Sequence, residues 1–99
     1  MAKPARAPQS HRCFFVTSST WERRQLFRSE PMARLFLHVL FHYRGEGKYM
    51  LHEFVLMPDH FHLLITPDST ITLERAIQFV KGGYSFRASK ELGLKGEIW

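Results

Sequence analysis

The sequence predicts an α+β fold in which a ferredoxin-like antiparallel sheet carries two helices on one face and is truncated before its fourth strand. Three observations support this prediction. The segments follow the order strand, helix, strand, strand, helix, which is five of the six elements of the split β-α-β-β-α-β pattern. Apolar residues recur at helical spacing in the two expected helices and form short, nearly continuous runs in the expected strands. The length of 99 residues, 44% of them hydrophobic, suffices for one small core.

The first strand is expected over residues 12–19, which are rich in aromatic and β-branched residues. Residues 1–11 precede it with two prolines and no apolar run, so we expect a short disordered leader there. Residues 21–25 have no clean periodicity and are expected to form a loop with a basic, partly aromatic surface. The domain is therefore expected to span residues 12–99 and to be incomplete at its C-terminal end.

The first long helix is expected to begin after Ser29, because serine is a favourable N-cap and Pro31 is tolerated in a first turn. Gly45 and Gly47 are expected to end it. Its buried stripe has the spacing of one helix face and comprises Met32, Leu35, Phe36, Val39, Leu40 and Tyr43. Three polar residues lie off the stripe and are expected to be solvated: His38, His42 and Arg44.

Residues 49–56 and 61–66 are predicted strands, and the tight connection 57–59 makes them an antiparallel hairpin. A second helix follows, capped by Thr70 or Thr72. Gly82 and Gly83 weaken this helix midway, and Gly93 is expected to end it. Its apolar stripe is Leu73, Ala76, Ile77, Val80 and Tyr84.

The composition favours a polyanionic partner. Fourteen Lys and Arg against nine Asp and Glu give a net charge of +5 and a pI of about 9.8. The single Cys13 can form neither an internal disulfide nor a cysteine-based zinc site, and no apolar run approaches a membrane span. We expect a soluble cytoplasmic protein whose metal, if it holds one, is bound by histidine and oxygen ligands.

The pair His60 and His62, in the stretch Met-Pro-Asp-His-Phe-His-Leu-Leu-Ile over residues 57–65, is the main candidate site. Strand alternation places both imidazoles on one face with Leu64, and their Cα atoms are roughly 7 Å apart, so both can reach one divalent cation. The alternative is that they are polar residues on a solvated sheet face. Glu53 is a candidate third ligand, although a solvated edge position also explains it. Asp59 is a candidate for orienting a histidine, although as a turn residue it needs no such role.

Three segments together resemble the HUH single-strand endonucleases, and within them the single-tyrosine transposases of the REP-associated and insertion-sequence kinds. They are Phe-Phe-Val-Thr at 14–17, Met-Pro-Asp-His-Phe-His-Leu-Leu at 57–64 and Lys-Gly-Gly-Tyr at 81–84. The resemblance spans most of residues 12–99, and the central segment is the most specific.

The resemblance implies a transposase-like enzyme that recognises single-stranded or hairpin DNA and cuts one strand. In this family the two histidines and one further polar ligand hold Mg²⁺ or Mn²⁺ against the scissile phosphate. The nucleophile is a tyrosine on a helix after the fourth strand, which is expected beyond Trp99. Tyr84 continues an apolar stripe and is interpreted as a core residue, and Tyr43 and Tyr49 have no better claim to be the nucleophile.

Six residues are candidate DNA contacts from the net charge and the resemblance: Trp21, Arg23, Arg24, Lys81, Arg87 and Lys90. Relatives often dimerise, so the resemblance also allows a homodimer. Two other hypotheses stay open. One is a non-catalytic nucleic-acid-binding module, although such a sheet would be expected to display aromatic residues rather than histidines on its open face. The other is an inactive transposase remnant.

Overall fold

A computed structural model describes residues 12–99, and the leader expected over residues 1–11 lies outside them. Three strands and two long helices make up most of this part of the chain, with two short 3-10 turns, η2 and η3, after the first strand. Their bounds are β1 Phe14–Ser19, η2 Trp21–Arg23, η3 Leu26–Arg28, α2 Glu30–Gly45, β2 Tyr49–Met57, β3 His60–Pro67 and α3 Leu73–Leu92.

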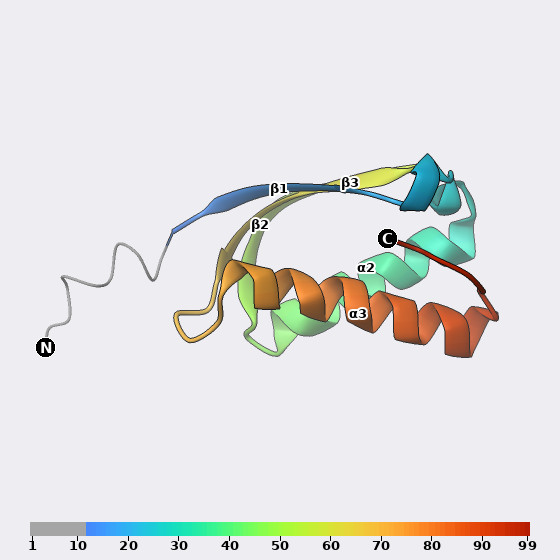
Figure 1. Cartoon of the computed structure of the whole chain (residues 1–99). Coiled ribbons are helices and arrows are strands. Elements are labelled where there is room, and N and C mark those ends of the chain that lie inside the picture. Colours follow the sequence, from blue (N-terminus) through green and yellow to red (C-terminus); the bar gives the residue numbers. More distant parts are fainter. Residues whose placement is uncertain (1–11) are drawn as a thin grey trace, which may run out of the picture.

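The strands form one antiparallel sheet in the order β1-β3-β2, and α2 and α3 lie together on one side of it (Figure 1). This arrangement confirms the α+β fold with an antiparallel sheet and two helices on one face. The central strand is β3, which pairs with β1 on one side and with β2 on the other. We call the face of the sheet opposite the helices the open face.

The register of the strands determines which side chains reach the open face. Thr17 of β1 pairs with His62, and Val55 of β2 pairs with His62 from the other side. A β-bulge lies between Leu51 and Glu53. Because the extra residue reverses the alternation of β2, Glu53 pairs with Leu64 on the open face instead of pointing toward the helices. The near-continuous hydrophobicity of β2 gave no sign of this bulge.

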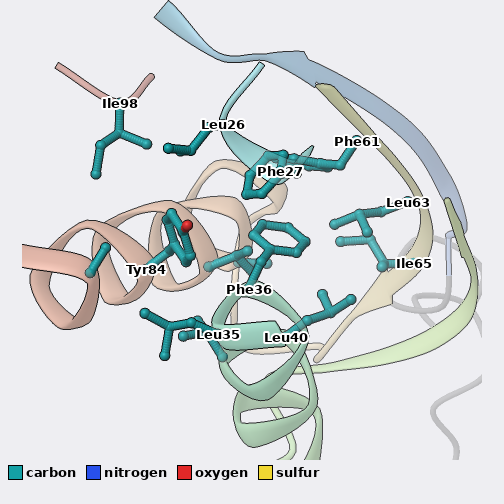
Figure 2. Close-up of a cluster of buried hydrophobic side chains, with 14 of the residues drawn as sticks. Leu26, Phe27, Leu35, Phe36, Leu40, Phe61, Leu63, Ile65, Tyr84 and Ile98 are labelled. Carbon is teal, nitrogen blue, oxygen red and sulfur yellow. The ribbon is translucent and has the colours of Figure 1, made fainter. Parts of the chain in front are cut away.

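The core lies between the helices and the inner face of the sheet (Figure 2). Phe61, Leu63 and Ile65 of β3 are almost completely buried there, as strand alternation predicted. Aromatic rings fill the centre of the core, and Phe36 of α2 packs against Phe61 at a centroid distance of 5.0 Å. Tyr84 of α3 is also fully buried.

The ends of the helices agree with the sequence in two respects and differ in one. Thr72 caps α3 by accepting a hydrogen bond from the backbone N–H of Arg75. Gly93 ends the helix with a φ of +67° in the left-handed region. The predicted side-chain cap at Ser29 is wrong, because its hydroxyl makes no capping hydrogen bond. Its carbonyl accepts the N–H of Ala33 instead.

Two further expectations are refined. The hairpin connection is shorter than expected, because β2 continues to Met57 and β3 already begins at His60. The residues of α2 that were predicted to be solvated are exposed: His38, His42 and Arg44. Within residues 12–99, neither helix combines the length and the apolar character that crossing a bilayer requires.

Candidate metal site

His60 and His62 project from the central strand with their Nε2 atoms only 3.1 Å apart. They are two residues apart on β3 and therefore share the open face. Their rings are nearly perpendicular, with centroids 4.8 Å apart. The prediction that the two imidazoles lie on the same face of the sheet is confirmed.

Each histidine is held through its other ring nitrogen. His60 Nδ1 lies 2.7 Å from Asp59 Oδ1. The hydrogen bond with His60 holds the pKa of Asp59 below its ordinary value, and Arg23 adds to this effect. An ionised carboxylate can only accept, so His60 donates from Nδ1, which leaves Nε2 to accept a hydrogen bond or to bind a cation.

The partner of His62 is Thr17 of β1, whose Oγ1 lies 2.9 Å from His62 Nδ1. A hydroxyl can donate or accept, so Thr17 suits either tautomer of His62. With no ion present, His62 can donate from Nε2 to His60. To bind an ion through Nε2, His62 would carry its proton on Nδ1 and would donate a hydrogen bond from there to Thr17 Oγ1. Thr17 was not predicted from the sequence, because only the pairing of β1 with β3 brings it beside His62.

The histidine pair fits a divalent cation. Two ligand atoms about 2.1 Å from one octahedral ion and at right angles to each other are roughly 3 Å apart, close to the separation of the two Nε2 atoms. Histidine ligands also ordinarily have their other nitrogen held by a carboxylate or another oxygen, as both do here. Among residues 12–99, however, no group of three His, Cys, Asp or Glu side chains is arranged to hold a metal.

Glu53 is on the open face, because the bulge turns it there, and its strand partner is Leu64. It shares with His62 the lining of a shallow hollow on the open face. No hydrogen bond or ion pair joins Glu53 to either histidine in the described residues. Its role as a third ligand remains a prediction.

A turn with an unusual backbone carries Arg23 to the site. Glu22 and Arg23 have φ values of 54° and 55°, in the left-handed region that non-glycine residues seldom adopt. Arg23 Nε donates to Asp59 Oδ2 at 3.0 Å, and its Nη1 donates to Ser19 Oγ. The guanidinium therefore lies beside the carboxylate that holds His60, with most of its side chain in solvent.

The rest of the turn is fixed by hydrogen bonds. Buried Thr20 donates from its hydroxyl to the carbonyl of Arg24. Arg24 in turn donates to the carbonyl of Glu97, so its guanidinium has a structural partner. Trp21 is about half exposed, and its backbone N–H donates to the carbonyl of Ile98.

The other basic candidates are not brought to the histidines. They lie on α3, which covers the opposite face of the sheet (Figure 1). Arg87 is paired with Glu91, Lys90 lies over the ring of Phe86, and Lys81 lies over Trp99. Of the six predicted DNA contacts, Arg23 lies beside the histidine pair, Trp21 and Arg24 are bonded to residues 97–98, and the other three lie on α3.

No tyrosine within residues 12–99 is presented to the histidine pair. The hydroxyl of Tyr84 donates to the carbonyl of Met32, and that of Tyr49 donates to the carbonyl of Leu40. Burial raises the pKa of Tyr84 to about 12, and burial also raises the pKa of Tyr49 above its ordinary value. Tyr43 packs against Phe79 of α3. The interpretation of Tyr84 as a core residue agrees with this placement.

The open face also carries an aromatic side chain, which the sequence analysis did not expect there. Phe15 of β1 is 69% exposed and stacks on His62. The expectation that the open face displays histidines rather than aromatic rings is therefore confirmed for β3, where Phe61 is buried, and is wrong for β1. A separate hollow of about 510 Å³ lies at the far end of β3, where Arg44 and Asp68 are among its lining residues.

Comparison with known proteins gives one family. The family model described as "Transposase IS200 like" matches residues 11–99. No curated protein matches the chain.

Proposed function

The chain belongs to the IS200-like transposase family, and we propose that it acts as a single-strand DNA endonuclease and strand transferase of the HUH type, with His60 and His62 holding the metal ion. One observation supports this assignment above all. The two Nε2 atoms converge to 3.1 Å while each Nδ1 is held by an oxygen atom. A hydrogen bond between the two rings holds this arrangement without an ion, and the same arrangement presents both Nε2 atoms to one cation.

Mg²⁺ or Mn²⁺ is the proposed ion, and Mn²⁺ suits a site with imidazole nitrogens better. When bound, the ion would supply Lewis-acid stabilisation of the charge that develops on the scissile phosphate. The protein's own groups orient the site. Asp59 holds His60, Thr17 holds His62, and the exposed guanidinium of Arg23 offers N–H donors to a phosphate beside them.

The proposed substrate is single-stranded or hairpin DNA, in keeping with the transposase family and the net charge of +5. In this proposal Arg23 contacts the strand beside the histidines, and Trp21 of the same turn adds an exposed aromatic ring. Lys81, Arg87 and Lys90 would contact a hairpin that reaches around to α3. The proposed nucleophile is a tyrosine, and none of the three tyrosines within residues 12–99 has its hydroxyl at the histidine pair. Glu53 would become the third ligand by turning its carboxylate toward the two imidazoles.

Manganese binding tests the assignment of the metal site. Isothermal titration calorimetry with Mn²⁺ should detect a site that disappears in the double variant His60→Ala with His62→Ala. A control with the same number of changes is His38→Ala with His42→Ala on α2, which should bind Mn²⁺ as the unchanged protein does. Unchanged binding in the first variant, or equal loss in both, would remove the basis for the proposal.

A second candidate function is a non-catalytic nucleic-acid-binding module, which the exposed Phe15 on the open face favours. Metal dependence separates the two functions. In an endonuclease site the ion held by the histidines would also contact the DNA phosphate, so Mn²⁺ or Mg²⁺ should tighten hairpin binding and the double histidine variant should abolish this effect. A binding module would have the same hairpin affinity in that variant and in the presence of a chelator.

A further inference from the structure

Phe15 is the most exposed large apolar side chain in the described part of the chain, at 69%. Exposure alone does not mark a site, because Phe86 on α3 is 66% exposed without any relation to the histidines. Phe15 differs in its contact. Its ring stacks on the imidazole of His62 with centroids 5.6 Å apart and planes within 21°. One side of this phenyl ring thus borders the candidate metal site, while much of the rest remains open to solvent.

Apolar side chains continue from Phe15 across the sheet. Its strand partner is Leu64, and Val55 from β2 is about half exposed opposite His62. We call Phe15, Leu64 and Val55 the apolar shelf. All three line a hollow of about 60 Å³ beside His62. That volume holds about two water molecules, so a larger flat group would lie over the shelf rather than inside the hollow.

The two ends of the site on the open face differ in charge. At the His60 end lie the guanidinium of Arg23 and the hydroxyl of Ser19, which can donate to an anion. At the shelf end the charged side chain is Glu53, which disfavours an anion. The face therefore has a place for a phosphate at one end and a place for an apolar ring at the other, with the histidine pair between them.

A nucleotide combines an anionic phosphate and a flat, largely apolar base in one molecule. A phosphate at the histidine pair would have its own or the adjacent base within reach of the shelf, and a base that is not paired can stack on an exposed aromatic ring whatever its identity. A base within a duplex is already stacked and paired, so the shelf would favour an unpaired nucleotide.

We propose that the apolar shelf, with Phe15 as its principal member, is a stacking subsite for one unpaired nucleobase next to the phosphate at the histidine pair. This inference rests on the proposed function, because it takes the phosphate position from the histidines. It adds a preference for single-stranded DNA at the reacting nucleotide, independent of base sequence.

Fluorescence anisotropy on the full chain tests the subsite with two labelled strands of equal length and charge, an oligothymidylate and a fully abasic strand. The unchanged protein should bind the oligothymidylate about 5- to 150-fold more tightly at one fixed salt concentration, the range that stacking of one base on an aromatic side chain supplies. In Phe15→Ala this ratio should fall toward one. In Phe15→Trp, which keeps an aromatic ring, it should persist.

Phe86→Ala is the matched control, because it removes an equally exposed phenyl ring from the other side of the sheet and should leave the ratio unchanged. Mn²⁺ binding by Phe15→Ala separates this inference from the proposed function. Retained Mn²⁺ binding together with an undiminished ratio overturns the stacking subsite alone, whereas failure of the unchanged protein to bind Mn²⁺ overturns the proposed function.

A second copy of the chain is the competing occupant of the shelf. Sedimentation of the unchanged protein and of Phe15→Ala distinguishes the two. If the variant turns a dimer into a monomer and leaves the ratio unchanged, the shelf is a protein interface and the proposal is overturned. A loss of the ratio at constant sedimentation supports the nucleobase subsite.

Discussion

Gly82 and Gly83 are adjacent in the middle of α3, and their replacement by alanine should have opposite effects on stability. A β-carbon at Gly82 would meet no atom within 4 Å. A β-carbon at Gly83 would lie 2.8 Å from Cε2 and 3.1 Å from the hydroxyl oxygen of Tyr43. The ring of Tyr43 on α2 thus occupies the space that the missing side chain leaves.

These distances give the expected magnitudes. Alanine in a helix interior is favoured over glycine by about 0.5–1 kcal/mol, so Gly82→Ala should raise the free energy of unfolding by that amount. Gly83→Ala gains the same term, but the ring of Tyr43 must move by roughly 1 Å to reach ordinary contact. That ring already packs on Phe79 at a centroid distance of 5.2 Å, and such overpacking costs about 1–3 kcal/mol. The two variants should therefore differ by about 1–3 kcal/mol.

Urea denaturation monitored by circular dichroism measures this difference, and the slope with urea should be unchanged in both variants. The double variant Gly83→Ala with Tyr43→Ala tests the cause, because the penalty at Gly83 should vanish once the ring is gone. If Gly83→Ala stabilises the protein as much as Gly82→Ala does, the ring of Tyr43 moves freely and the close packing of α2 on α3 does not depend on this glycine.

Three further predictions concern the site and the core. Asp59→Asn and Thr17→Val should each weaken Mn²⁺ binding about 10- to 100-fold in calorimetry, because each orients one histidine; full affinity in both would mean that these contacts are incidental. Burial raises the pKa of Tyr84 to about 12 from about 10 in an unfolded chain. Its contribution to stability is therefore complete below about pH 10 and is lost as the pH rises toward 12. Tyr84→Phe should be less sensitive to alkaline pH in urea titrations, and equal sensitivity would contradict this. Trp99→Ala should lower the free energy of unfolding by about 3 kcal/mol, because its ring packs among four core aromatic rings and its indole N–H donates to a carbonyl of α3; a loss within experimental error would show that this packing is dispensable.

Local patterns in the sequence predicted much of the fold. Both long helices follow apolar stripes at helical spacing, and Thr72 and Gly93 mark the ends of α3 as their chemistry requires. The common face of His60 and His62 also follows from strand alternation alone. These features depend on residues close together in the chain, so a single sequence suffices to predict them.

The remaining features depend on contacts between distant segments or on backbone detail. Thr17 reaches His62 across 45 residues of sequence, and only the strand order β1-β3-β2 brings them together. The bulge after Leu51 could not be read from a nearly continuous apolar run, so the face of Glu53 was not predictable from β2 itself. The left-handed backbone at Arg23 was likewise not predictable, because no glycine or asparagine occupies this turn.

The central position of β3 links the candidate site to the folding of the whole sheet. His62 has its orienting partner on β1 and its other strand neighbour, Val55, on β2. The arrangement of the pair therefore exists only when both ladders have formed. A ligand that binds this arrangement and not the unfolded chain stabilises the fold by mass action, about 2.7 kcal/mol at one hundred times its dissociation constant. The melting temperature would then rank divalent cations by affinity before any cleavage assay is available.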